Sequence, residues 1–316
     1  MRRRIILMPL GLLAVIPFLR LRHGPRQPDA EAVRAAYDVP LPAPKGPLRV
    51  FHLGHSLVGR DMPAMLAQLA PAGHRYDSQL GWGTSLKEHW QGGAAINGFL
   101  AENAHERYRD AKEAIGSGDY DAVVLTEMVE IRDAIRYHDS ADSLHRWTDL
   151  ARQGNAGTRL YLYETWHRLD DPEGWLTRLD LDLGRYWEAA LALPDLARTG
   201  KSKSPIHIIP AGQVMAAFVR RVEAAGGVGD IRNREGLFAR DAAGDLDPIH
   251  VNDLGAYLVA LTHYAVLYHR TPEGLPNDLR KADGTKALSP APEAARLMQE
   301  VVWQVVRGYD KTGVGK

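Results

Sequence analysis

Five short, mostly apolar runs recur along the chain, and amphipathic segments separate them. The runs cover residues 48–53, 75–80, 121–126, 159–165 and 205–210. All but the second are almost continuously apolar, which is typical of strands that are buried on both faces of a parallel sheet. Alternation of such strands with helices predicts an α/β protein, a three-layer α/β/α sandwich built on a five-stranded parallel sheet with right-handed crossovers.

Four of the intervening segments carry helix signals. They are residues 61–71, 94–118, 140–155 and 253–270. The first has a proline in its opening turn, the second ends on glycines, and the third begins with a serine suited to capping. We expect the last to be a long amphipathic helix that packs one face on the sheet.

Ser56 stands just past the first predicted strand, in the sequence Gly54-His55-Ser56. Binding sites of open α/β sheets lie beyond the carboxyl ends of the strands, so this serine is a candidate for chemistry. We expect Gly54 to permit a sharp turn, and the next helix to begin close to Ser56 with its N–H groups toward the site. The alternative is that Ser56 only caps that helix.

A serine hydroxyl is a weak nucleophile unless a base takes its proton, and the base is usually a histidine held by a carboxylate. Residues 245–255, DLDPIHVNDLG, supply both groups. Asp247 precedes His250 by three residues, and a turn there can place the carboxylate beside the imidazole. Asp245 and Asp253 are also close, so the spacing alone leaves the identity of the carboxylate open.

Two blocks of the sequence resemble those of the SGNH/GDSL hydrolases. Gly54-His55-Ser56-Leu57 resembles the GDSL block, and Asp247 with His250 matches the closing D-x-x-H. Asn252 and Gly255 also resemble that family's tail, and the resemblance spans about residues 48–270. It implies a flavodoxin-like SGNH hydrolase fold, a triad of Ser56, His250 and Asp247, and hydrolysis of esters without a metal or cofactor.

The resemblance also implies an oxyanion hole made by the Ser56 N–H, a glycine N–H and an asparagine side chain. The glycine block corresponds to LGWGTSL, where Gly83 is preferred over Gly81 because Thr-Ser follows it. The third strand leads into TEMVEIRD, which contains no asparagine. Divergent members carry a Gln-Glu pair at this strand end, which Thr126-Glu127 resembles, so we expect Glu127 to orient the site.

His55 replaces the aspartate of the GDSL block, and we expect it to make a supporting hydrogen bond. With His52 it forms H-x-x-H, but a strand that enters a turn does not align positions i and i+3, and no third ligand is near. We therefore predict no metal site. Trp166 follows the fourth strand and is a candidate substrate wall, because aromatic faces suit sugar rings; ordinary packing is the alternative.

Composition narrows the classes of function. Lys+Arg and Asp+Glu are equal at 39 each in 316 residues, without the basic stripe of a nucleic-acid binder. The absence of cysteine excludes disulfides, thiolate metal sites and a cysteine nucleophile.

The N-terminus predicts export. MRRR precedes an uncharged apolar run at 5–19, so residues 1–22 are expected to form a signal peptide or a signal anchor. An uncleaved membrane anchor is favoured because no small-x-small cleavage site follows. Residues 23–47 are proline-rich and predict an extended linker with one short helix over 29–37, and residues 48–316 the hydrolase-like domain. We expect a periplasmic or membrane-anchored location outside the cytoplasm.

Together these features predict an exported serine ester hydrolase that forms an acyl-serine intermediate. The expected substrate is a saccharide or related ester that carries acyl, chiefly acetyl, groups, by analogy with the family. One alternative is an acyltransferase, in which a sugar hydroxyl replaces water as the acceptor. The other is a non-catalytic module that binds a glycan or a partner protein, which the missing asparagine and the His55 substitution motivate.

Overall fold

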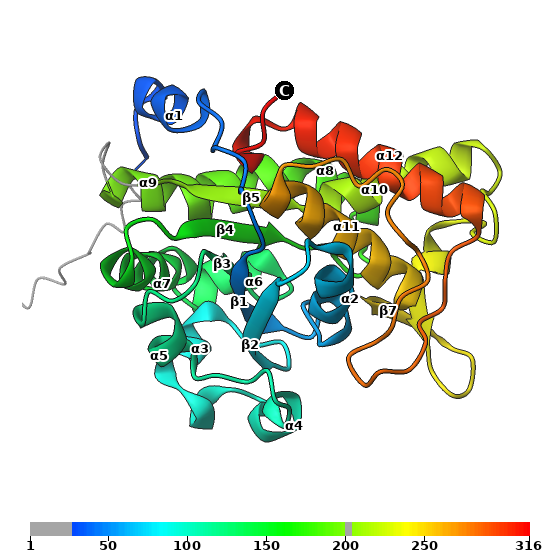
Figure 1. Ribbon diagram of the computed structural model, residues 1–316, viewed down its shortest axis with the longest axis horizontal. Helices are drawn as coiled ribbons and strands as arrows, with labels where there is room; N and C mark the ends of the chain where they lie inside the picture. Colours follow the sequence, from blue (N-terminus) through cyan, green and yellow to red (C-terminus); the bar gives the residue numbers. More distant parts are fainter. Residues whose placement is uncertain (1–26, 200–203) are drawn as a thin grey trace, which may run out of the picture.

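A five-stranded parallel sheet forms the centre of the protein, as the sequence predicts. The computed structural model describes residues 27–199 and 204–316. The strands lie in the order β2-β1-β3-β4-β5 (Figure 1). Their bounds are β1 Arg49–His55, β2 Arg75–Gly81, β3 Ala122–Leu125, β4 Arg159–Glu164 and β5 Ile206–Pro210. Strand order reverses at β1, so the carboxyl ends of β1 and β3 border a crevice where ligands bind in doubly wound folds.

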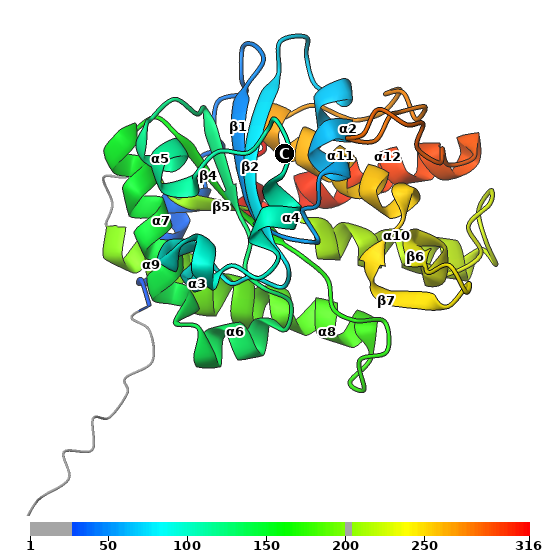
Figure 2. The ribbon, with the colours of Figure 1, turned by 90° about the horizontal axis from the view of Figure 1, so that it is seen from below.

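Helices cover both faces of the sheet, which completes the three-layer sandwich (Figures 1 and 2). One layer contains α2 Asp61–Leu69, α8 Trp175–Asp182, α10 Ala211–Ala224, α11 Asp253–Tyr268 and α12 Pro292–Gly308. The other contains α3 Leu86–Gln91, α5 Ala111–Gly116, α6 Ile131–Tyr137, α7 Ser140–Gly154, a π-helical stretch Leu183–Ala192 and α9 Leu193–Thr199.

Smaller elements complete the chain. They are α1 Ala30–Tyr37, α4 Phe99–Asn103, the short antiparallel strands β6 Phe238–Arg240 and β7 Leu246–Val251, and 3-10 turns at Gly93–Ala95, Arg234–Leu237 and Asp310–Thr312.

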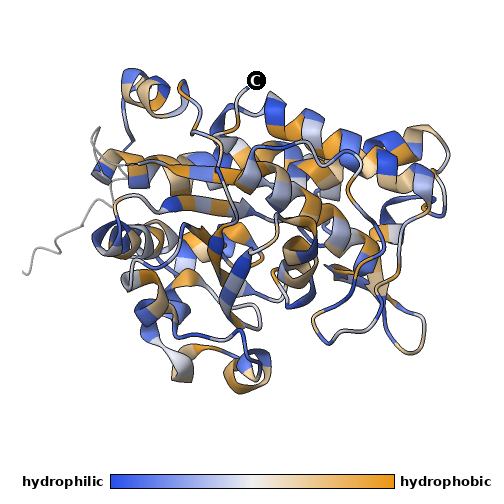
Figure 3. Ribbon diagram, viewed as in Figure 1, coloured by the Kyte–Doolittle hydropathy of each residue, from blue (hydrophilic) through white to orange (hydrophobic). Residues whose placement is uncertain are grey.

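Alternate strand residues enter opposite cores, which explains why the strands read as continuous apolar runs. Val50 packs in the core beneath α10, α11 and α12, whereas Phe51 and Leu53 pack in the core beneath α5 and α7. All three side chains are fully buried. Figure 3 shows hydrophobic residues along the central strands and the helices that flank them. When both faces of a strand are buried, apolar and polar residues do not alternate along it.

The segment 94–118 is not one helix, contrary to the expectation from sequence. It breaks into a 3-10 turn, α4 and α5, with Gly98 in the left-handed region at φ 68°. The stretch between α4 and α5 pairs instead with β2, the edge strand of the sheet. The Ser78 N–H donates to the Arg107 carbonyl at 2.9 Å, and the Arg109 N–H donates to the Ser78 carbonyl at 3.2 Å. These bonds satisfy backbone groups that an edge strand leaves unpaired.

Helix α11 is buried on all sides and not amphipathic as expected. Every residue from Leu254 to Tyr268 is buried. The helix packs against α2, α10 and α12 as well as against the sheet, so no face reaches solvent. A helix with apolar residues all round fits this enclosed position.

The proline-rich segment before β1 contains the short helix that the sequence predicts, α1. The Tyr37 side chain is buried, and its hydroxyl donates to the Ile206 carbonyl of β5 at 3.0 Å. Leu41 N–H donates to the Gly313 carbonyl at 2.9 Å. The predicted anchor over residues 1–22 lies outside the described residues. Within 27–199 and 204–316, no helix has the length and apolar character needed to cross a membrane.

Candidate active site

Ser56 opens a turn directly after β1. Val58 N–H donates back to the His55 carbonyl at 2.9 Å, which closes the turn. Helix α2 begins only at Asp61, with Arg60 at its N-cap, so the expectation that the helix starts beside Ser56 is wrong. The capping alternative fails for the same reason, because Ser56 lies too far from the first turn of α2 to bond its N–H groups.

Gly54 is required for close packing and not for a turn. The residue lies inside β1 and is buried. A Cβ at this position would lie 2.5 Å from Thr126 Cγ2 and 2.8 Å from Val58 Cγ2. The structure therefore corrects our expectation about the backbone turn: glycine lets the neighbouring strand end and the Ser56 turn approach each other.

Asp247 and His250 lie within β7, in a bulge that interrupts its pairing with β6. The ladder pairs Arg240 with Leu246 and Phe238 with Val251. Four residues, 247–250, thus oppose the single residue 239. Bulges re-aim side chains near active sites, and this one turns the segment toward the end of β1.

Ser56, His250 and Asp247 form a continuous hydrogen-bonded chain. Ser56 Oγ lies 3.0 Å from His250 Nε2, and His250 Nδ1 lies 2.8 Å from Asp247 Oδ2. A carboxylate can only accept, so Nδ1 carries the proton and Nε2 offers its lone pair to the serine hydroxyl. The geometry matches that of a nucleophile, a base and an orienting group.

The backbone fixes the Asp247 carboxylate. Its Oδ1 accepts hydrogen bonds from the N–H groups of Ile249 and His250, both at 2.9 Å. Partial burial acts to raise the pKa of Asp247, but these N–H donors and the imidazole outweigh it and hold the pKa below its usual value. The carboxylate therefore stays charged beside the imidazole at neutral pH.

In the described segment 204–316, neither of the two other candidate carboxylates bonds to His250, and one of them is bonded elsewhere. Asp253 Oδ2 accepts from the Leu288 N–H at 2.7 Å, and Asp245 lies in an exposed turn where its N–H donates to Asp241 Oδ1 at 2.9 Å. Among the residues that the structure describes, Asp247 is the carboxylate that contacts His250. The site is open, since the side chains of His250 and Asp247 are 45% and 33% exposed.

Two backbone N–H groups remain candidates for the oxyanion hole, those of Ser56 and Gly83. β1 and β2 pair in register, with His55 opposite Gly81, so the loop that contains Gly83 follows β2 at the same sheet edge as Ser56. Gly83 is exposed and has φ 55°, a conformation that favours glycine. Across residues 27–199 and 204–316, nothing accepts a hydrogen bond from the Ser56 or Gly83 N–H.

Glu127, two residues after β3, braces this loop through one carboxyl oxygen. Its Oε1 accepts from the N–H groups of Leu86, at 3.2 Å, and Met128, at 2.8 Å. Leu86 is the first residue of α3, three positions after Gly83. Burial raises the pKa of the Glu127 carboxyl to about 7. Glu127 thus orients the segment that follows Gly83, which is the role that the sequence predicts.

His55 makes the expected supporting hydrogen bonds. Its Nε2 donates to the Glu127 carbonyl at 2.8 Å, and its Nδ1 accepts from the Leu57 N–H at 3.3 Å. With one nitrogen donating and the other accepting, the ring is neutral, and burial lowers its pKa to about 4. His52 lies instead near His263, with ring centroids 6.0 Å apart. No group of three or more metal-ligating side chains occurs in the described part of the chain.

Trp166 is buried and holds the backbone next to His250. The indole N–H donates to the Ile249 carbonyl at 2.7 Å, and the side chain is 1% exposed. Leu169 N–H, from the same loop after β4, donates to the Pro248 carbonyl at 2.8 Å. Trp166 therefore does not present a face to a substrate. It holds the bulge that carries Asp247 and His250.

Two further residues hold the Ser56 turn, and the sequence analysis missed both. His89 Nε2 donates to the Gly54 carbonyl at 2.9 Å, and the Tyr163 hydroxyl donates to the Leu57 carbonyl at 3.1 Å. Both carbonyls flank Ser56. In the sequence, His89 in a short helix and Tyr163 in an apolar strand carry no signal that distinguishes them from packing residues. Their contact with this turn is determined by the tertiary structure.

Comparison with known proteins shows the fold. No family model and no curated protein matches the chain. A DUF4886 family protein from Bacteroides uniformis superposes with a TM-score of 0.52 at 16% identity, over 84% of this chain and 96% of that one. A putative GDSL-like lipase from Parabacteroides merdae has a TM-score of 0.38 at 12% identity, over 71% of this chain and 97% of that one. The first match supports a shared α/β architecture.

Proposed function

We propose that this protein is an SGNH-type serine ester hydrolase. The observation that carries the proposal is the Ser56–His250–Asp247 chain, with distances of 3.0 and 2.8 Å. The GDSL-like and D-x-x-H blocks of the sequence support it, since they supply these same three residues. The class of hydrolase rests on this site and on that resemblance, and the fold alone does not imply it.

The reaction has two stages. As Ser56 Oγ bonds to the ester carbonyl carbon, its proton passes to His250 Nε2, and Asp247 stabilises the imidazolium. The N–H groups of Ser56 and Gly83 stabilise the oxyanion, each by about 3 kcal/mol. Collapse of the intermediate breaks the ester bond, and the departing alkoxide takes the proton from His250. Water then repeats the sequence on the acyl-serine and releases the acid.

A fluorophosphonate probe tests the nucleophile. The wild-type chain should be labelled and should release acetate from p-nitrophenyl acetate. Ser56→Ala should abolish both while changing the free energy of unfolding by less than about 0.5 kcal/mol, because Ser56 caps no helix. Ser117→Ala, at the end of α5, is the matched control and should retain both. Labelling that persists in Ser56→Ala would overturn the proposal.

The acceptor separates a hydrolase from an acyltransferase, because both use the same acyl-serine. Product analysis with and without saccharide acceptors decides between them. A hydrolase releases acetate at the same rate in both conditions. Acetylated saccharide in place of acetate would assign the transferase reaction to this site.

A further inference from the structure

Trp82 is an exception among the tryptophans of the protein. Trp82 is 49% exposed, whereas Trp147, Trp166, Trp175 and Trp187 are essentially buried and Trp90 and Trp303 are partly buried. An exposed indole combines a large apolar face with a polar N–H, which suits it to contacts with a ligand. Its position in the fold indicates which contact.

Trp82 lies on the loop after β2, beside the end of β1 that leads into Ser56. It follows Gly81, which pairs with His55, and it directly precedes Gly83. The Trp82 backbone therefore lies between the residue paired with His55 and a proposed oxyanion donor. Its side chain belongs to the same loop as Gly83, at the carboxyl end of β2.

The indole is held in one orientation. Its N–H donates to Glu102 Oε1 at 2.6 Å, and its backbone N–H donates to the Asn97 carbonyl at 2.8 Å. One ring face lies against Gly98, where a Cβ would be only 2.3 Å from ring atom Cδ2. Glycine at this position lets the ring rest on the backbone. A fixed aromatic ring binds a ligand with little loss of side-chain entropy.

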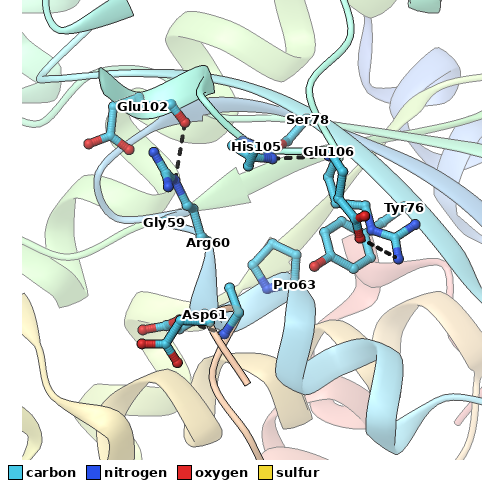
Figure 4. Close-up of a pocket in the computed structure, with 12 residues that line it drawn as sticks. Gly59, Arg60, Asp61, Pro63, Tyr76, Ser78, Glu102, His105 and Glu106 are labelled. Carbon is cyan, nitrogen blue, oxygen red and sulfur yellow. Dashed lines mark hydrogen bonds and ion pairs between the residues drawn. The ribbon is translucent and has the colours of Figure 1, made fainter. Parts of the chain in front are cut away.

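Charged groups line a pocket that Trp82 adjoins through Glu102. Glu102, its hydrogen-bond partner, lines this pocket of about 680 Å³ together with Gly59 and Arg60, whereas Trp82 and Ser56 are not among the lining residues (Figure 4). In this pocket Arg60 Nε donates to the Glu102 carbonyl at 3.2 Å. Charged side chains form much of the lining: Arg60, Asp61, Glu102, Glu106, Arg107 and Asp283. Such a lining disfavours an acyl chain and suits a polyhydroxylated ligand.

We propose that Trp82 is the platform on which a sugar ring of the substrate packs during ester cleavage. The apolar C–H face of a pyranose fits an aromatic face, and its hydroxyls find carboxylate acceptors at Glu102. The inference rests on the proposed ester hydrolase function and adds the residue that selects a saccharide ester over a small ester.

Two substrates of different size test the platform. Trp82→Ala should lower kcat/KM at least about tenfold on partly acetylated xylo-, manno- or gluco-oligosaccharides. On p-nitrophenyl acetate, which is too small to need the ring, the loss should stay below about twofold. Trp82→Phe should recover most of the activity on oligosaccharide. Leu100→Ala removes another exposed apolar side chain, on the adjacent helix α4, and should change neither value.

A binding measurement is independent of turnover. In Ser56→Ala, which cannot cleave the ester, the acetylated oligosaccharides should shield tryptophan fluorescence from acrylamide, and the additional Trp82→Phe exchange should remove that shielding. Equal losses on both substrates, unchanged activity of Trp82→Ala on every oligosaccharide, or no shielding would overturn the inference. Absence of any ester cleavage by the wild type would instead contradict the proposed function, and the fluorescence experiment would still decide the role of Trp82.

Discussion

The indole N–H of Trp166 donates to the carbonyl of Ile249, 2.7 Å away, and Ile249 directly precedes His250. This bond ties the loop after β4 to the bulge of β7, so a buried residue helps to set the position of His250, the proposed general base. Positions of this kind affect turnover because small displacements of a catalytic group slow the chemical step strongly.

Trp166→Phe should therefore lower kcat by roughly tenfold to a hundredfold with little change in KM, since the imidazole loses its fixed distance to Ser56. Steady-state kinetics on p-nitrophenyl acetate measures both. Trp187→Phe is the matched control, because Trp187 is equally buried but belongs to the opposite core. Equal turnover in the two variants would show that the Ile249 bond does not position His250.

Asp247→Asn tests the orienting carboxylate. The amide oxygen can keep the bonds from Ile249 and His250 N–H, but the amide NH₂ then faces Nδ1 and favours the tautomer with the proton on Nε2. That nitrogen can no longer take the serine proton, so kcat should fall by about 10⁴ with the fold intact. Asp245→Asn and Asp253→Asn should retain activity. A comparable loss in either of those variants would reassign the carboxylate.

The pH dependence of stability should report on Glu127. Its folded pKa, raised by burial to about 7, exceeds the usual 4.5. Between these values the unfolded chain is ionised and the folded chain keeps its proton, so the free energy of unfolding falls as pH rises, by about 1.4 kcal/mol per unit. Glu127→Gln should remove this component.

The measurement is urea unfolding of wild type and Glu127→Gln at steps from pH 4.5 to 8. The difference between the two curves should change with pH up to about 7 and then level off. Buried histidines contribute equally to both chains and cancel. Glu113→Gln, at an exposed glutamate, should run parallel to the wild type. A pH-independent difference for Glu127→Gln would show that the carboxyl is not held protonated.

We also propose that residues 1–22 anchor the chain at a membrane with the folded part outside the cytoplasm. The full-length chain should sediment with membranes and resist a carbonate wash, whereas a chain starting at Gln27 should be soluble and folded. A chain starting at Pro40 loses Tyr37, which is buried against β5, and its free energy of unfolding should drop by roughly 3 kcal/mol. Recovery of the full-length chain entirely in the cytosolic fraction would reject the anchor.

The sequence by itself determined the class of fold and the candidate nucleophile and base; the choice of Asp247 over Asp245 and Asp253 came from the family resemblance and agrees with the contact in the structure. Strands buried on both faces must be continuously apolar, so four of the five runs could be located from this pattern alone, and the edge strand β2 is the exception. Ser56, Asp247 and His250 were found because a nucleophile, a base and a carboxylate are required together, and because Asp247 and His250 are only three residues apart. Those inferences need no knowledge of which distant segments meet.

Tertiary structure decided the rest, because the remaining features depend on contacts between segments far apart in the chain. Glycine is required at position 54 because Thr126, just after the neighbouring strand, leaves no room for a Cβ. Trp166 bonds to the bulge residue Ile249, which is 83 positions away in the chain. Helix α11 is buried on every side because α2, α10 and α12 pack around it. Segment 94–118 is broken because part of it pairs with the edge strand β2. The sequence does not distinguish Trp82 from other aromatic residues. The register of β1 and β2 places its loop beside the end of β1, and such a contact between distant segments cannot be inferred from local pattern.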